Sequence, residues 1–210
     1  MSRGEVSDGE RFAEQVRSLV LHTVAHDADA DATVALAELA ESLADAMEEN
    51  ISRTLSAEAV GGPSVHPVSG VGNPIAAPLV DTVDGNQAVA AGTYTVTHEG
   101  PPGCVHGGAI AAGFEHVVER SETLFGVPPT FTHVGPGSRE VRIQYRRPTL
   151  LDLPLRFEAD PPIDTGSGSM TIEARLLQVG EVTCEATAVW TPDTPFGPIG
   201  DGDATDIEAQ

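Results

Sequence analysis

The amino-acid sequence predicts an α+β fold in which a curved antiparallel sheet wraps around one long central helix, with an N-terminal helical extension. A glycine-rich turn at residues 100–108 runs directly into an apolar-periodic segment over 109–125, which is typical of a long buried helix. Strand-like segments lie on both sides of it, two before and four after. A single apolar helix among antiparallel strands has to be covered on several sides, and a curved sheet provides that cover.

The composition is strongly acidic. The 210 residues carry a formal charge of −21 and contain no lysine, so all 11 basic residues are arginine. Nucleic acids and anionic membranes need a basic face, so the charge argues against both as partners. Because the two cysteines lack metal-ligand spacing and no leader or long apolar run occurs, we expect a soluble, cytoplasmic protein with reduced thiols. We expect no cofactor and no metal.

Two amphipathic helices are expected before the sheet, over residues 9–25 and 33–55. In the second helix, apolar residues recur every three or four positions and form one stripe, with acidic residues on the other faces. The stripe comprises Leu36, Leu39, Leu43, Met47 and Ile51. The sequence leaves open whether this helical pair packs on the domain, extends a dimer interface or caps a tunnel in the domain.

Composition divides the chain into four parts. Residues 1–59 form the N-terminal helical extension, and the Gly/Pro-rich stretch over 60–77 is a connector. Residues 78–192 form the α+β domain, and the acidic Gly/Pro-rich tail over 193–210 is expected to be disordered.

The strands of the domain follow from short β-branched or alternating segments between turn residues. Asp84-Gly85 indicates a hairpin turn, Pro128-Pro129 prevents the helix from continuing, and Gly180 marks a tight turn between the last two strands. The expected strands cover residues 78–83, 87–97, 139–147, 153–159, 169–179 and 181–190.

The start of the central helix is a candidate site for acyl-transfer chemistry. Backbone N–H groups in the first helical turn have no partner within the helix and lie at the positive end of its dipole. They can hold an anion, or a carbonyl oxygen that is becoming one. Glu115 follows His106 by nine residues and is an acid in an otherwise apolar stretch of the same helix.

Spacing along the helix indicates that these two features serve different sites within one chain. At about 1.5 Å per residue, Glu115 lies about 10–13 Å from the helix start, which is too far for both to contact one carbonyl group. Two antiparallel helices side by side would bring the amides of one chain to the carboxylate of the other. The sequence therefore predicts a homodimer, or a dimer of dimers, with two equivalent shared sites.

His106-Gly107-Gly108 followed by an acid resembles the hotdog-fold acyl-CoA thioesterases, specifically the PaaI-like group. The Gly-Pro-Pro-Gly stretch at 100–103 resembles the same group. So does the segment over 138–148, in which a serine precedes an alternating strand that ends in Tyr-x-Arg-Pro. The resemblance covers about residues 70–191 and leaves the two N-terminal helices outside. It implies the hotdog fold, a dimer and hydrolysis of an acyl-CoA thioester.

The resemblance also implies roles for individual residues. The backbone N–H of Gly108, and also that of Gly107, would polarise the thioester carbonyl, and His106 would hold the turn in shape. Glu115 would act as general base for water or as nucleophile, since families of this fold differ on that point. Ser138 would position the water or the carboxylate, and the loop that carries Asn73 would approach the site.

Two features of this chain bear on the substrate. The PaaI-like group more often has Asp at the position of Glu115, whereas relatives of the hydroxybenzoyl-CoA type have Glu, so the acyl group stays open. Arg139, Arg146 and Arg147 belong to a local cluster of arginines that could bind coenzyme A phosphates. The alternative function is a non-catalytic acyl-CoA-binding hotdog protein; a lyase or dehydratase of the same fold is the third.

Overall fold

A computed structural model describes residues 8–25, 27, 29–48, 73–126, 137–166 and 169–192 of the chain. The chain divides into two compact units, one of residues 1–81, 91–113 and 148–155, the other of residues 82–90, 114–147 and 156–210. The connector residues 60–72 and the tail 193–210 lie outside the described residues, so the expectations for them stay predictions.

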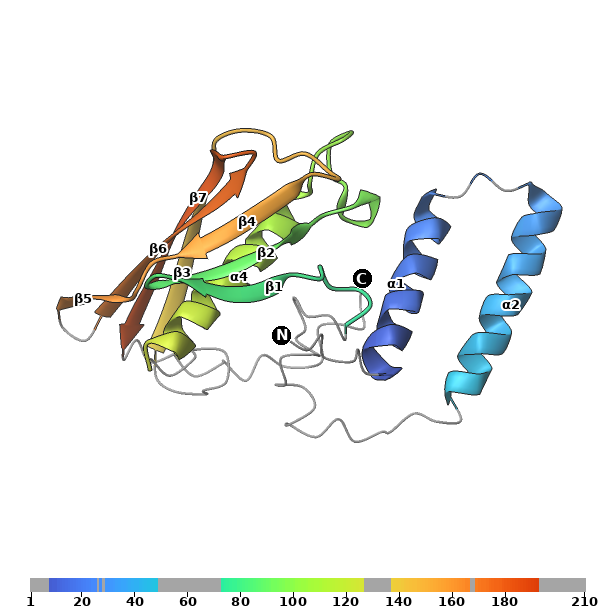
Figure 1. Cartoon of the computed structure of the whole chain (residues 1–210), viewed down its shortest axis with the longest axis horizontal. Coiled ribbons are helices and arrows are strands. Elements are labelled where there is room, and N and C mark those ends of the chain that lie inside the picture. Colours follow the sequence, from blue (N-terminus) through green and yellow to red (C-terminus); the bar gives the residue numbers. More distant parts are fainter. Residues whose placement is uncertain are drawn as a thin grey trace, which may run out of the picture. The chain divides into compact units, whose positions relative to one another are not determined.

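The described elements follow the predicted order of helices and strands (Figure 1). They are α1 (Asp8–Ala25), α2 (Ala30–Glu48), β1 (Val80–Asp84), β2 (Gln87–Thr93), the 3₁₀ helix η1 (Val96–His98), α4 (Gly107–Leu124), β3 (Gly137–Tyr145), β4 (Pro154–Ala159), β5 (Ile163–Gly166), β6 (Ser169–Gln178) and β7 (Glu181–Pro192). The strands form one seven-stranded sheet in the order β1-β2-β4-β6-β7-β3, with β5 paired to β6. The predicted α+β fold is confirmed.

Several bounds differ from the prediction by a few residues. The second strand ends at Thr93 rather than Thr97, because the 3₁₀ helix η1 begins at Val96. Strand β5 was not predicted, because all four of its residues are exposed and show no apolar alternation. The second helix begins at Ala30, and residues 49–55 of its predicted range lie outside the described residues.

In the first unit, α1 packs against η1, and the Arg17 guanidinium donates a hydrogen bond to the Asn73 carbonyl (2.8 Å). Helix α2 leaves its apolar stripe exposed, as shown by Leu36, Leu39 and Leu43. None of the described helices combines the length and apolarity that a bilayer crossing requires.

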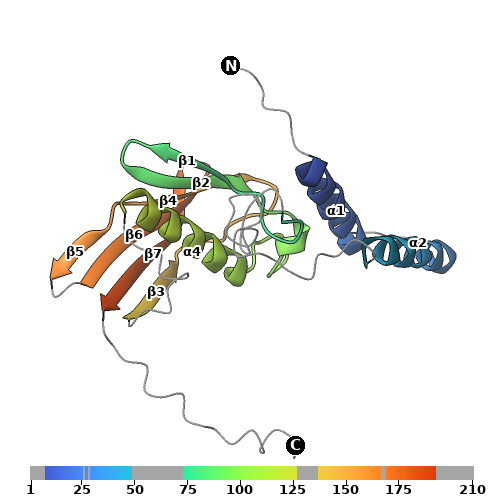
Figure 2. The ribbon, with the colours of Figure 1, turned by 90° about the horizontal axis from the view of Figure 1, so that it is seen from below.

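In the second unit, the later part of α4 lies against one face of the strands (Figure 2). Phe114 of α4 and Phe157 of β4 are both fully buried, and their rings meet edge to face with centroids 5.2 Å apart. Strand β6 alternates as a half-buried strand should, with Ile172, Ala174 and Leu176 turned inward. This apolar face fixes which side chains of each strand meet α4.

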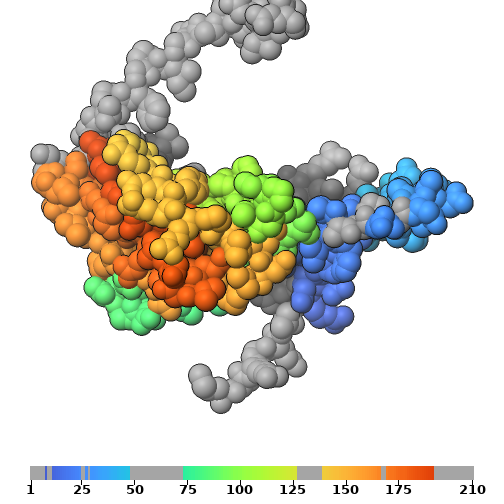
Figure 3. Space-filling model, turned by 90° about the horizontal axis from the view of Figure 1, so that it is seen from above, coloured from blue at the N-terminus to red at the C-terminus, as the bar shows by residue number. Residues whose placement is uncertain are grey.

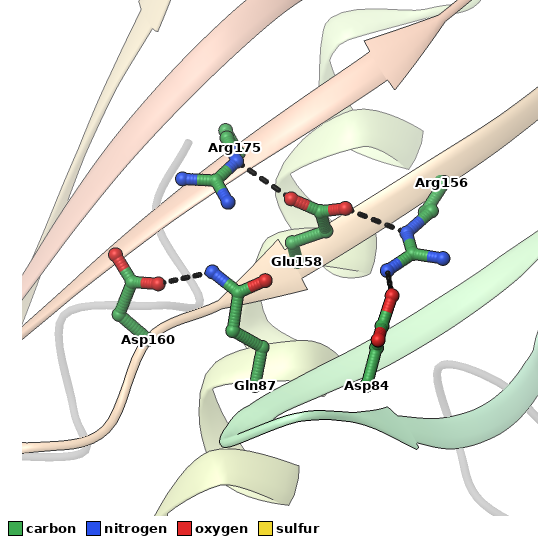
Figure 4. A network of polar contacts seen from close by, with 6 residues as sticks. All are labelled: Asp84, Gln87, Arg156, Glu158, Asp160 and Arg175. Carbon is green, nitrogen blue, oxygen red and sulfur yellow. Dashed lines mark hydrogen bonds and ion pairs between the residues drawn. The ribbon is translucent and has the colours of Figure 1, made fainter. Parts of the chain in front are cut away.

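The opposite face of the sheet carries a polar network (Figure 4). Glu158 accepts hydrogen bonds from Arg156 and Arg175 (2.6 Å each), and Arg156 also reaches Asp84 (2.7 Å). Gln87 donates to Asp160 beside it. The network links strands far apart in sequence without covering the face.

The predicted tight turn at Gly180 is confirmed. Val179 and Gly180 both have positive φ, at 53° and 78°, as a two-residue type I′ hairpin requires. Val179 is an exposed β-branched residue in this strained region, which glycine alone would occupy without cost.

We predict that Phe157→Ala lowers the free energy of unfolding by about 3–5 kcal/mol, because it removes a fully buried ring and leaves a cavity beside Phe114. Urea denaturation followed by circular dichroism measures the change. Phe125→Ala is the matched control, since Phe125 is exposed and should change stability by less than about 0.5 kcal/mol. Equal losses in the two variants would contradict this packing.

Candidate active site

The glycine-rich turn before α4 is closed by its own backbone. Gly100 N–H donates to the Cys104 carbonyl (2.9 Å), and Gly103, at φ +74°, donates to the Glu99 carboxylate (2.6 Å). A Cβ at Gly100 would lie only 2.8 Å from His106 Cα, so only glycine allows this close approach. The hydrogen-bonded turn therefore fixes the position of His106 directly before α4.

His106 caps the N-terminus of α4. Its carbonyl accepts hydrogen bonds from Ala109 (3.0 Å) and Ile110 (3.2 Å), and its ring Nδ1 accepts the N–H of Gly108 (2.9 Å). This is the contact of an N-cap residue, supplied by an imidazole rather than a hydroxyl or carboxylate. The Gly108 N–H, which the sequence predicts as a carbonyl-polarising donor, thus has an intramolecular acceptor in this structure.

Glu115 is held by a buried arginine. Nη2 of Arg139, on β3, forms an ion pair with Oε2 of Glu115, on α4. Nη1 of Arg139 also reaches Oε2 of Glu122 at 3.4 Å. The Arg139 side chain is 8 % exposed and that of Glu122 is 3 % exposed, whereas that of Glu115 is 33 % exposed. One buried cation therefore lies between two carboxylates of one helix.

The surroundings of this cluster are apolar. Ile172, Ala188 and Trp190 line a small void of about 10 Å³ beside Arg139 and Glu122. Burial lowers the pKa of the Arg139 guanidinium below its ordinary value, because desolvation disfavours the cation. Arginine nevertheless stays charged near neutral pH, so the two carboxylates offset a charge that is costly to bury.

Glu115 is only partly enclosed. Its Oε2 is buried and ion-pairs with Arg139, whereas 33 % of the whole side chain is exposed. The carboxylate can therefore be approached by a water molecule from its exposed side. An ionised carboxylate within reach of water can act as a general base or as a nucleophile.

The sequence did not reveal the partners of Glu115. We predicted that Arg139 binds a phosphate; the structure places its side chain beside Glu115 and Glu122, and a role toward coenzyme A stays a prediction. The second acid of α4 that Arg139 contacts is Glu122. The available signal was the seven-residue spacing of Glu115 and Glu122, which places both on one helix face.

Asn73 lies in a loop before β1, and Ser138 lies in strand β3. The Asn73 carboxamide oxygen accepts a hydrogen bond from the Ile75 N–H (3.1 Å), and its carbonyl holds Arg17 of α1. Ser138 is the second residue of β3 and pairs in register with Thr191 of β7. Roles for either residue toward a substrate stay predictions.

Arg146 and Arg147 lie on the exposed surface. Arg146 pairs with Glu185 (2.6 Å), and Arg147 pairs with Glu181. Arg146 borders a groove of about 330 Å³ on the sheet face opposite α4, on the side seen in Figure 3. The charged residues of this groove are Arg142, Arg146, Arg175, Asp160, Glu173 and Glu185. Its charges balance, so it has no net preference for an anion.

A search of the described residues for metal-ligating clusters finds no group of three or more His, Cys, Asp or Glu side chains that could hold a metal ion. The cluster around Arg139 is organised around a guanidinium instead.

Comparison with solved structures identifies the fold. A thioesterase superfamily protein matches with a TM-score of 0.70 and 23 % identity, over 88 % of this chain and 95 % of that chain. The chain shares the fold of that protein, and the predicted hotdog fold is confirmed. The residues from β1 to β7 alone cannot supply 88 % of the chain, so this hotdog match extends into the N-terminal part.

Further hotdog neighbours match a smaller share of the chain. The E. coli PaaI protein of the phenylacetic acid degradation operon has 13 % identity and a TM-score of 0.43, over 54 % of this chain and 78 % of that chain. A hypothetical thioesterase from Streptococcus pneumoniae, solved with coenzyme A, has 16 % identity and a TM-score of 0.41, over 54 % and 87 %. No protein-family model matches the sequence, and no curated protein does.

We predict that Arg139→Met lowers the free energy of unfolding by about 3–5 kcal/mol, because it leaves two carboxylates on one helix face without their buried cation. Urea denaturation at pH 7 measures the loss. Arg146→Met is the matched control: its ion pair is exposed and contributes less than about 1 kcal/mol. The account of the cluster fails if both variants are equally stable.

Proposed function

We propose that this protein hydrolyses acyl-CoA thioesters to a free acid and coenzyme A. The observation that carries the proposal is the Glu115 carboxylate, which is ion-paired through Oε2 with Arg139 and one-third exposed, in the helix that begins at Gly107 directly after His106. The hotdog fold supports it at the level of the fold alone.

In the proposed reaction, Glu115 orients a water molecule and takes its proton as the water oxygen attacks the thioester carbon. The carbonyl oxygen becomes an oxyanion, which N–H groups at the start of α4 stabilise. When the tetrahedral intermediate collapses, the C–S bond breaks and the coenzyme A thiolate takes up the proton. Direct attack by Glu115, through an anhydride that water then cleaves, is the other course open to the same carboxylate.

The proposed site is shared between two copies of the chain. Gly107 and Gly108 begin α4 and Glu115 lies two turns further along it, so one carbonyl group cannot contact both within one helix. In a two-fold dimer, each α4 contributes its N-terminal amides to one site and its carboxylate to the other. Ser138 is proposed to position the attacking water, and the loop carrying Asn73 to border the substrate.

Coenzyme A phosphates are proposed to bind Arg146 and Arg147. Both arginines are exposed, and their ion pairs with Glu185 and Glu181 lie at the surface. Exposed ion pairs contribute little to stability, so a phosphate can replace the carboxylate at small cost. Arg139 belongs to the same predicted set, but its ion pairs with Glu115 and Glu122 favour the different role that is argued below.

Glu115→Gln should lower kcat on a panel of short, medium, long and aromatic acyl-CoAs by at least about 10²-fold, since the amide cannot take a proton from water. A thiol-detecting reagent follows the released coenzyme A. The variant should stay folded, because Arg139 keeps Glu122 as a partner.

Glu119→Gln is the matched control, one helical turn away on α4. It should retain turnover within about twofold. Full activity of Glu115→Gln would refute the assignment of Glu115.

Mixing two inactive variants tests the shared site. Gly108→Pro removes one N–H from the helix start and disturbs Gly107, and Glu115→Gln removes the base from the other half-site. Random reassociation should restore about a quarter of the wild-type rate, because half of the dimers are mixed and each has one intact site. A mixture as inactive as its parents, with dimers verified by light scattering, would contradict a shared site.

The second candidate function is a non-catalytic acyl-CoA-binding protein. It is favoured by the hydrogen bond from Gly108 N–H to His106 Nδ1, which occupies a donor that catalysis would need. Such a protein would bind a non-hydrolysable acyl-CoA analogue in calorimetry and hydrolyse no thioester of the panel.

A further inference from the structure

We propose that Arg139 is a positioning residue that keeps Glu115 ionised and oriented, and that Glu122 limits its hold by sharing the same guanidinium. This inference deepens the proposed function and rests on it for its catalytic meaning. The ionisation that it describes can be measured without any turnover.

The geometry provides Arg139 with two different carboxylate partners. Arg139 reaches Glu115 through Nη2 and Glu122 through Nη1, so the two contacts use different ends of one planar guanidinium. Glu122 lies deeper than Glu115, with 3 % against 33 % of its side chain exposed. The buried carboxylate of Glu122 thus holds Arg139 on its interior side, whereas Glu115 lies partly in solvent.

Charge explains why both carboxylates are needed. A cation within a few ångströms favours the ionised form of a carboxylate, most strongly where water is excluded. A lone Arg139 would hold Glu115 charged but would also withdraw its basicity, because a strongly stabilised carboxylate accepts a proton poorly. Glu122 offsets part of the guanidinium charge and so preserves the proton affinity that a general base needs.

Other groups near Glu115 do not supply this control. On α4 itself the nearby acids are Glu119 and Glu122, and from β3 the charged neighbour is Arg139. The residues of β6 and β7 that line the void beside the cluster are Met170, Ile172, Ala188 and Trp190, none of which is charged. Within the described part of the chain, Arg139 is the cation that ion-pairs with Glu115.

The positions also explain why a lysine could not replace Arg139 fully. Two carboxylates seven residues apart on a helix lie two turns, or about 10 Å, apart along the axis. The N–H groups at the two ends of one planar guanidinium can contact both of their side chains. A lysine ammonium is a single point charge and would favour one partner. In Arg139→Lys the cation should therefore still favour the ionised form of Glu115, but it should hold the Glu115 carboxylate in a less defined orientation.

The test is the titration of the Glu115 carboxyl carbon by NMR in the full chain, together with the pH dependence of kcat. Arg139→Gln should move the Glu115 midpoint, and the acid limb of the rate profile, to higher pH by about one to three units. Glu122→Gln, a nearly isosteric change, should move both in the opposite direction. A merely structural role would lower kcat without moving either one.

Arg142→Gln is the matched control: it lies on the same strand, faces away from α4, pairs with Glu140 and should leave the midpoint unchanged. If Glu122→Gln and Arg139→Gln leave the Glu115 midpoint in place, or move it in the same direction, the inference is overturned. If the midpoints move as stated but the wild type hydrolyses no thioester, the proposed function fails while the control of ionisation by Arg139 stands.

Discussion

Burying one guanidinium between a helix and a strand constrains how this domain is built. Glu115 and Glu122 of α4 both ion-pair with Arg139 on β3 and offset its charge, so these contacts constrain the rotation of α4 relative to β3. The apolar contact of Phe114 with Phe157 holds the same helix against β4. Apolar packing alone would tolerate a small rotation of α4 more readily than the directional contacts of the largely buried Arg139 guanidinium do.

Helix α4 therefore presents different chemical groups at its two ends. Its first turn presents backbone N–H groups, and the His106 ring accepts the N–H of Gly108 there. Its later turns carry carboxylates whose charge is set from β3. Acyl transfer needs both an oxyanion donor and a base, and neither end contains both, which is why the proposed chemistry depends on a second copy of the chain.

Local sequence signals predicted the elements that local physics controls. The glycine turn, the apolar period of α4, the alternation of β3 and the Gly180 turn could be read directly, and their bounds agree to within a few residues. Strand β5 was not predicted, because it has no buried face. The contacts of Arg139 were not predicted for another reason. The carboxylate that a strand residue meets depends on the order of strands in the sheet, and β3 pairs with β7, a strand much later in the chain. Nonlocal pairing of this kind leaves no periodic trace in the sequence.

The most direct measurement of the central claim is a crystal structure of the protein with a 2-oxoalkyl thioether of coenzyme A. In this analogue a methylene group separates the carbonyl carbon from sulfur, so the carbonyl is kept and no thioester bond can be hydrolysed. The account predicts a two-fold dimer in which Glu115 of one protomer and the first amides of α4 of the other approach the same end of the acyl group. Arg139 should still hold Glu115 through one oxygen. A ligand bound away from Glu115, or a Glu115 with both oxygens engaged by Arg139, would contradict it.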